Sequence, residues 1–114
     1  MTPRPRDYLH PIAEDCVWTV GGTSAVAGEY RGRKAVAAFF ARLERLTGGT
    51  YEVEPVWELA DGERGVFLYR SRGARPDGRA LDLDQALVYR LEGGRWIDVR
   101  LLPFDQGVFD AFWS

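Results

Sequence analysis

The alternation in residues 79–91, RALDLDQALVYRL, most constrains what this chain can fold into. Large side chains stand at every second position from Leu81 to Leu91, and mostly polar or small side chains stand between them. Because successive side chains of a β-strand point to opposite faces, this period of two predicts a strand with one buried and one solvated face. Such a strand requires neighbouring strands and a second layer over its apolar face.

Residues 51–59, YEVEPVWEL, repeat the pattern, with apolar residues at the odd positions and glutamates at three even ones. We therefore expect Trp57 and Leu59 on the buried face of a strand. Further strands are predicted at 16–20, 65–72 and 95–102, between turns at Gly21-Gly22, Asp61-Gly62, Asp77-Gly78 and Gly93-Gly94. The last of these strands is expected to place Ile97, Val99 and Leu101 on one face and Trp96, Asp98 and Arg100 on the other.

A long helix is predicted from about Gly32 to Leu46, with Gly48 as the residue that ends it. A shorter helix is expected from Asp7 to about Glu14, and residues 21–32 are expected to form a loop. Residues 1–6 contain two prolines and are expected to be disordered. The apolar stripe of the long helix follows i, i+3, i+4, i+7 spacing through Val36, Phe39, Phe40, Leu43 and Leu46.

One amphipathic helix on one apolar sheet face gives an α+β two-layer domain, and 114 residues fit a single domain spanning 1–114. A strongly twisted sheet with a helix across it encloses a cone-shaped cavity, the usual form of a small-molecule pocket.

Composition excludes several function classes. Fifteen basic and 17 acidic residues are interleaved, so no basic stripe predicts a nucleic-acid partner. With one cysteine, Cys16, and one histidine, we expect neither a disulfide nor a metal site, and no other cofactor. No apolar run approaches the ~20 residues that span a membrane, and the N-terminus lacks a secretory signal, so we expect a cytoplasmic protein.

Three segments resemble the SnoaL-like branch of the NTF2-like superfamily. They are CVWTVGGTSAVAGEYRGRKAVAAFFARL (16–43), LDLDQALVYRLEGGRWIDVRLLPFDQ (81–106) and DQGVFDAFWS (105–114). The resemblance implies an NTF2-like cone, in which a curved antiparallel sheet packs on one long helix, here with a short N-terminal helix. It also implies a hydrophobic pocket for a small organic molecule. The fold hosts isomerases, cyclases, dehydratases, hydrolases and non-catalytic binders, so it does not by itself specify a reaction.

The chain departs from that family at its N-terminus. Members normally open with a long helix and most of a second one, which roof the pocket, and this chain starts near the end of the second. The roof is absent, or a partner supplies it, or the true start lies upstream. An uncovered apolar sheet favours association, and we expect a homodimer.

The catalytic groups of ketosteroid-isomerase relatives do not match here. Their base falls at Val20 and their oxyanion-hole acid at Leu87, while the acid of limonene-epoxide-hydrolase relatives falls near Leu101. His10 and Asp15 are the remaining catalytic candidates, His10 because histidine changes charge near neutral pH. The alternative for His10 is an exposed terminal side chain.

Gln85 interrupts an inward row of leucines, so it either orients a ligand or is a core amide bonded to backbone or to Arg70. Tyr69 and Arg70 alternate, and only one can face inward. Strand parity indicates Arg70, although a bulge would reverse this, and we favour the alternative of a solvated Arg70 on the outer face. Asp82 and Asp84 share the opposite face, where ion pairs with Arg90 or Arg100, in solvent or at a dimer interface, are expected.

Residues 31–34, at the start of the long helix, are a second candidate site, for an anion.

The function predicted is binding of a compact apolar molecule, either with proton transfer that needs no cofactor, or without catalysis as a binding or dimerisation module. Trp18, Trp57 and Tyr89 would form aromatic pocket walls or plain core. The predicted ligand-binding residues are Trp18, Val20, Phe40, Trp57, Arg70, Gln85, Leu87, Val99 and Leu101.

Overall fold

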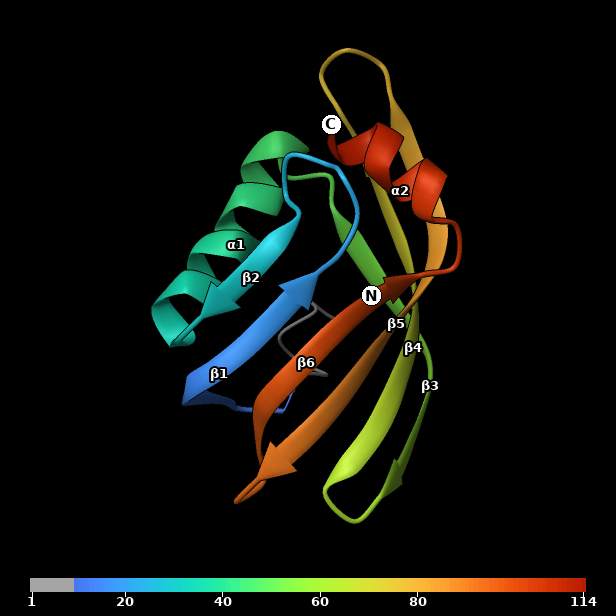
Figure 1. Ribbon diagram of the computed structural model, residues 1–114. Helices are drawn as coiled ribbons and strands as arrows, with labels where there is room; N and C mark the ends of the chain where they lie inside the picture. Colours follow the sequence, from blue (N-terminus) through green and yellow to red (C-terminus); the bar gives the residue numbers. More distant parts are fainter. Residues whose placement is uncertain (1–9) are drawn as a thin grey trace.

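The computed structural model describes residues 10–114, which form one curved six-stranded sheet and two helices (Figure 1). Along the sheet the strands are ordered β2-β1-β6-β5-β4-β3, antiparallel throughout except that β1 and β6 run parallel. The mixed α+β class is therefore confirmed, with one parallel pair that we did not expect. The elements are β1 (Ile12–Val20), β2 (Gly28–Arg31), α1 (Arg33–Leu46), β3 (Glu52–Asp61), β4 (Arg64–Ala74), β5 (Ala80–Glu92), β6 (Arg95–Pro103) and α2 (Gln106–Trp113).

The N-terminal part differs from the prediction. The expected helix from Asp7 to Glu14 is wrong for residues 12–14, which belong to β1, and residues 1–9 lie outside the described residues. The carbonyl of Pro11 accepts a hydrogen bond of 2.8 Å from the Trp96 amide, so pairing with β6 begins here. The expected loop at 21–32 also contains β2, where Tyr30 pairs with Trp18.

The long helix α1 follows its predicted spacing and packs on β1 and β2. Gly32, with φ of 90°, adopts a conformation that favours glycine and lets its amide donate to the Cys16 carbonyl at 2.8 Å just before the helix begins. Val36, Phe39 and Leu43 are buried against the sheet. The predicted apolar stripe is therefore confirmed as the face that closes the inner side of the domain.

A register shift between Pro55 and Trp57 turns over the second half of β3. Proline has no amide hydrogen for the ladder, and an extra residue in a strand reverses the faces beyond it. Trp57 and Leu59 consequently lie on the outer face, 45% and 67% exposed, and their predicted burial is wrong. Glu58, expected outside, takes the inner face opposite Phe67.

A second shift, between Arg90 and Leu91 where β5 pairs with β6, moves Trp96 to the buried side. Leu91 pairs with Trp96 while Arg90 pairs with Asp98, so Ile97 is the extra residue. Trp96 and Val99, predicted on opposite faces, are 1% and 0% exposed.

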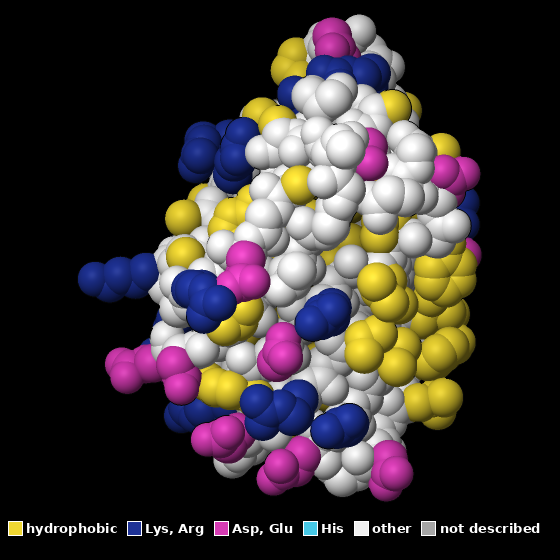
Figure 2. All heavy atoms as spheres, viewed as in Figure 1, with side chains coloured by type: hydrophobic (Ala, Val, Ile, Leu, Met, Phe, Trp, Pro, Cys, Tyr) yellow, Lys and Arg dark blue, Asp and Glu magenta, His cyan; other side chains and the backbone are white. Residues whose placement is uncertain are grey.

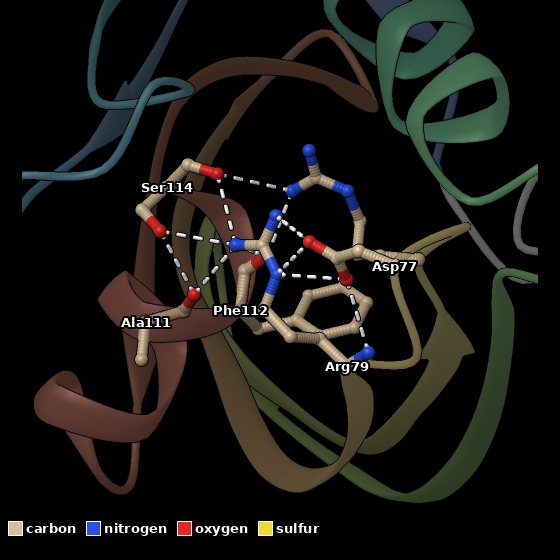
Figure 3. Close-up of polar contacts among 6 residues, drawn as sticks. Asp77, Arg79, Ala111, Phe112 and Ser114 are labelled. Carbon is tan, nitrogen blue, oxygen red and sulfur yellow. Dashed lines mark hydrogen bonds and ion pairs between the residues drawn. The ribbon is translucent and has the colours of Figure 1, made fainter.

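The C-terminal helix α2 covers β5 and β6 with its aromatic side chains. Asp105 caps its start by accepting a 3.0 Å bond from the Val108 amide. At its end, Arg79 from the β4–β5 hairpin donates to the carbonyls of Ala111 and Phe112, at 2.9 and 3.2 Å, and Asp77 holds the guanidinium (Figure 3). A cation is favoured at this negative end of the helix dipole.

The two phenylalanines of α1 provide a test of the helix register. Phe39 is 2% exposed, whereas Phe40 is only partly buried and meets Trp18 edge-on. We expect Phe39→Ala to lower the free energy of unfolding by about 3–5 kcal/mol, since it empties a core position, and Phe40→Ala to lower it by less. Chemical denaturation of both variants measures this, and equal losses would contradict the described packing.

Candidate functional site

The inner face of the sheet brings most of the predicted ligand-binding residues together. Trp18 and Val20 of β1 stand in cross-strand rows with residues of β6 and β5, and Phe40 contacts Trp18 from α1 with ring centroids 5.0 Å apart. The first row is Trp18, Val99 and Tyr89, and the second is Val20, Leu101, Leu87 and Phe67. All seven side chains of these rows are buried.

Glu58 ends the second row, and there it meets two other titratable side chains. The Tyr89 hydroxyl donates a hydrogen bond to Glu58 Oε2, and His10 Nε2 lies 3.0 Å from the same oxygen. The side chains of His10 and Glu58 are 31% and 36% exposed, whereas Tyr89 is 3% exposed. We call His10, Glu58 and Tyr89 the carboxylate cluster; it lies between solvent and the apolar rows.

Two local features position the cluster. Gly65 is paired with Tyr89, and a Cβ there would collide with the Tyr89 hydroxyl and lie 2.9 Å from the Leu59 carbonyl. Glycine therefore lets the phenol cross β4 toward Glu58. The His10 ring packs beside Tyr89 and Trp96, with centroids 5.3 and 5.6 Å away.

The electrostatics of the cluster follow from burial. Burial raises the pKa of Tyr89 above its ordinary value, and the hydrogen bond to Glu58 and the charge of Glu58 raise it further. The phenol therefore stays protonated as a donor at neutral pH. An ionised carboxylate is an acceptor only, so Glu58 accepts from Tyr89 and can accept from His10.

Two indole N–H groups lie next to the cluster without acceptors. Trp18 Nε1 and Trp96 Nε1 are buried, and neither has a hydrogen-bond partner within residues 10–114. Their rings are 5.4 Å apart, and Trp96 also contacts Tyr89 at 5.6 Å. A buried donor left unpaired costs about 1–3 kcal/mol, so both groups are suited to an acceptor oxygen from outside the described residues.

Gln85 lies further along the same face of β5 and is 1% exposed. Its Nε2 donates to the Tyr69 hydroxyl at 2.9 Å. The partners expected for a core amide at this position were the backbone or Arg70. Its Oε1 has no partner among the described residues. Burial raises the pKa of Tyr69 well above the usual range, so this phenol also stays protonated.

Other candidates lie outside this face. Tyr69 faces inward and Arg70 outward, so the inward orientation that strand parity indicates for Arg70 is wrong and the favoured outer-face position is confirmed. The Arg70 guanidinium donates to Asp82 at 2.6 Å and to Asp84 at 3.1 Å. The two aspartates share the outer face as predicted, but their partners are Arg70 and Arg72 rather than Arg90 or Arg100. Trp57 is on the outer face as well.

Of the catalytic candidates, His10 belongs to the carboxylate cluster, whereas Asp15 is an exposed residue of β1. At the candidate anion site, Arg31 pairs with Glu29, and Arg33 donates to the Ile12 carbonyl at 2.9 Å. Sequence reasoning missed Glu58; the observation that could have found it is Pro55 inside a strand pattern, because proline often marks a bulge.

The described residues contain no group of three metal-binding side chains and no helix long and apolar enough to cross a membrane. Cys16 is buried, and burial, with the nearby charges of Asp98 and Asp15, raises its pKa to about 11. Its thiol is therefore protonated and poorly nucleophilic at neutral pH.

The outer face of the sheet carries an open groove of about 510 Å³. One cross-strand row, Leu59, Val66 and Val88, makes its floor apolar. Trp57 and Leu102, 45% and 49% exposed, add apolar surface on this face. Hydrophobic side chains gather on the right of Figure 2, where Figure 1 places β3 and β4. Charged residues of both signs border the groove: Asp61, Arg64, Arg90, Asp98 and Arg100.

The model of the SnoaL-like domain matches residues 4–99 of the chain. The uncharacterised protein Rv0034 of Mycobacterium tuberculosis is 30% identical over 105 residues, which cover 90% of this chain and 79% of that protein. Bal32a, from a soil-derived mobile gene cassette, has a similar structure, with a TM-score of 0.86 and 32% identity over 90% of this chain and 79% of its own.

A structure described as a putative SnoaL-like polyketide cyclase from Jannaschia sp. CCS1 aligns with a TM-score of 0.73. It is 19% identical over 91% of this chain and 74% of its own, so it shows the shared fold alone. The chain belongs to the SnoaL-like domain family and has the NTF2-like fold, as the sequence resemblance predicted.

The hydrogen bond between Glu58 and Tyr89 can be tested by titration. We expect Glu58→Gln to lower the pKa of Tyr89 toward its ordinary value, because the variant removes the negative charge that opposes ionisation. The absorbance of tyrosinate as a function of pH measures this pKa. The variant Tyr89→Phe shows which part of the titration curve belongs to Tyr89 among the five tyrosines. Glu54→Gln, on the outer face of the same strand, is the control and should leave the curve unchanged. Superimposable curves for Glu58→Gln and the parent chain would rule out the bond.

Proposed function

We propose that this protein binds a small, largely apolar carbonyl compound on the inner face of its sheet, and that Glu58 transfers a proton to or from it. The observation that carries the proposal is the position of Glu58, a carboxylate at the end of an apolar row that also accepts a hydrogen bond from Tyr89. An acid or histidine on this face is what separates a proton-transfer enzyme from a passive binder.

The proposed step needs no co-reactant. Glu58 removes a proton from a carbon next to the carbonyl. The electron pair of the broken C–H bond forms a C=C bond, and the π pair of the C=O bond moves to the oxygen, which gives an enolate. The unpartnered indole N–H groups of Trp18 and Trp96 are donors for this developing oxyanion. Where the substrate carries a C=C bond conjugated with the enolate, return of the proton to the far end of that bond shifts the double bond and completes an isomerisation. Return to the same carbon regenerates the substrate.

The chain's other residues would hold the substrate and the carboxylate. Tyr89 orients Glu58, and His10, which is partly exposed, links the carboxylate to solvent. Gln85 would contribute a polar contact deeper on the face. The apolar wall would consist of Trp18, Val20, Phe40, Leu87, Val99 and Leu101. We place this activity in the cytoplasm and assign it no metal or cofactor.

A second proposed role, homodimerisation, rests on the outer groove. Its apolar floor and its border of three arginines and two aspartates suit a second copy of the same chain. In a two-fold contact the same patch meets itself, so the arginines of one protomer can face the aspartates of the other. An uncharged apolar ligand would not use this border.

Deuterium exchange tests proton transfer. In D₂O we expect the protein to accelerate incorporation of deuterium into the acetyl group of 2-acetylnaphthalene, an apolar ketone with removable α-hydrogens. Glu58→Gln should lose about 100-fold or more of this acceleration, the usual scale of general-base catalysis, and Glu54→Gln should retain it. Proton NMR follows the loss of the acetyl signal. Binding without exchange would leave the protein as a non-catalytic binder.

Sedimentation at micromolar concentration tests the dimer. We expect the parent chain to sediment as a dimer and Leu59→Glu to sediment as a monomer, because the variant buries a charge in the groove without a partner. Ala37→Glu adds the same charge at an exposed position of α1 and should leave the dimer intact. A parent chain that is monomeric would refute this role.

A further inference from the structure

We propose that Gln85 and Tyr69 form a second binding station, specific for a hydroxyl group at the far end of the ligand. The inference rests on the proposed function, since it takes the carbonyl end of the ligand to lie at Glu58. It adds the chemical class of the ligand: a flat apolar molecule with a carbonyl at one end and a hydroxyl at the other.

The hydrogen bonds of the station define what it can bind. Gln85 Nε2 donates to the Tyr69 oxygen at 2.9 Å, so the hydroxyl hydrogen of Tyr69 remains to be donated. Gln85 Oε1 accepts nothing from the described residues. The pair therefore offers one donor and one acceptor, and a ligand hydroxyl can accept the first and donate to the second.

Within residues 10–114, the surroundings of Gln85 supply no partner for its Oε1. Its cross-strand neighbour on β6 is Pro103, which has no amide hydrogen, and its neighbours along the inner face of β5 are Leu83 and Leu87. Both members of the pair are buried, at 1% exposure for Gln85 and 4% for Tyr69. A buried amide oxygen without a hydrogen-bond donor destabilises the fold. Because Gln85 Oε1 lies on the apolar face, a hydroxyl group of the ligand is a suitable donor.

The spacing along β5 sets the size of the ligand. Gln85 and Tyr89 lie four residues apart on one strand face, about 13 Å between Cα atoms. The side chains between them are apolar and buried, Leu87 on β5 and Phe67 on β4, and the rings of Phe67 and Tyr69 are stacked with centroids 5.4 Å apart. An apolar body of about two fused rings, with an oxygen at each end, suits this span.

Two matched probes separate the station from the carboxylate cluster. They are 6-acetyl-2-naphthol and 2-acetylnaphthalene, which differ only by the hydroxyl, and quenching of tryptophan fluorescence measures their dissociation constants. We expect the parent chain to bind the hydroxylated probe about tenfold or more tightly. In Gln85→Leu and Tyr69→Phe that ratio should fall to about one, with the affinity for 2-acetylnaphthalene retained as evidence of an intact fold. Glu58→Gln should keep the ratio while losing deuterium exchange.

The outcomes are distinct. Equal affinity of the parent chain for the two probes would overturn the station, and so would an unchanged ratio in both variants; deuterium exchange would still support the proposed function. If neither probe bound, both proposals would be refuted.

Discussion

The irregularity in β3 between Pro55 and Trp57 determines both faces of this molecule. Before it, Val53 faces the core; beyond it, the strand is turned over, so Glu58 enters the inner face while Trp57 and Leu59 face outward. A single extra residue thus places a carboxylate beside the apolar rows and, at the same time, creates the exposed surface of the outer groove. The candidate chemistry and the candidate association are two consequences of one strand distortion.

Gly65 links this distortion to the rest of the site. The Tyr89 phenol reaches Glu58 by passing over a position where any side chain would collide with it. Because Tyr89 is buried and stays protonated, its hydroxyl remains an uncharged hydrogen-bond donor to Glu58 at neutral pH. Glu58 of β3 is therefore oriented by a buried residue of β5, on the far side of β4, and such fixed support is how a catalytic group is held in one geometry.

The sequence predicts the regular parts of the fold well. The alternation of β5 correctly places Leu81, Leu83, Gln85, Leu87 and Tyr89 on the buried face, and the apolar stripe of α1 is the buried one. The prediction fails where a strand contains an extra residue. Because side chains alternate between faces, one extra residue that the sequence does not reveal puts every later position of the strand on the wrong face.

For this reason the period-two pattern places Trp57, Leu59 and Trp96 on the wrong faces and Glu58 on the solvated one. The pairing of Gln85 with Tyr69 was missed for a related reason, since which of Tyr69 and Arg70 faces inward depends on sheet register and not on the local sequence.

The unpaired polar atoms of the core are concentrated rather than scattered. Of the four buried side-chain atoms without partners in the described residues, three belong to Trp18, Gln85 and Trp96 on the inner face, and the fourth is Nε of Arg75 in the β4–β5 hairpin. An ordinary core satisfies such groups internally or replaces them with apolar side chains at little cost. Two donors beside a carboxylate and one acceptor further along the same apolar face form an incomplete hydrogen-bonding pattern, and a molecule carrying oxygen at both ends would complete it.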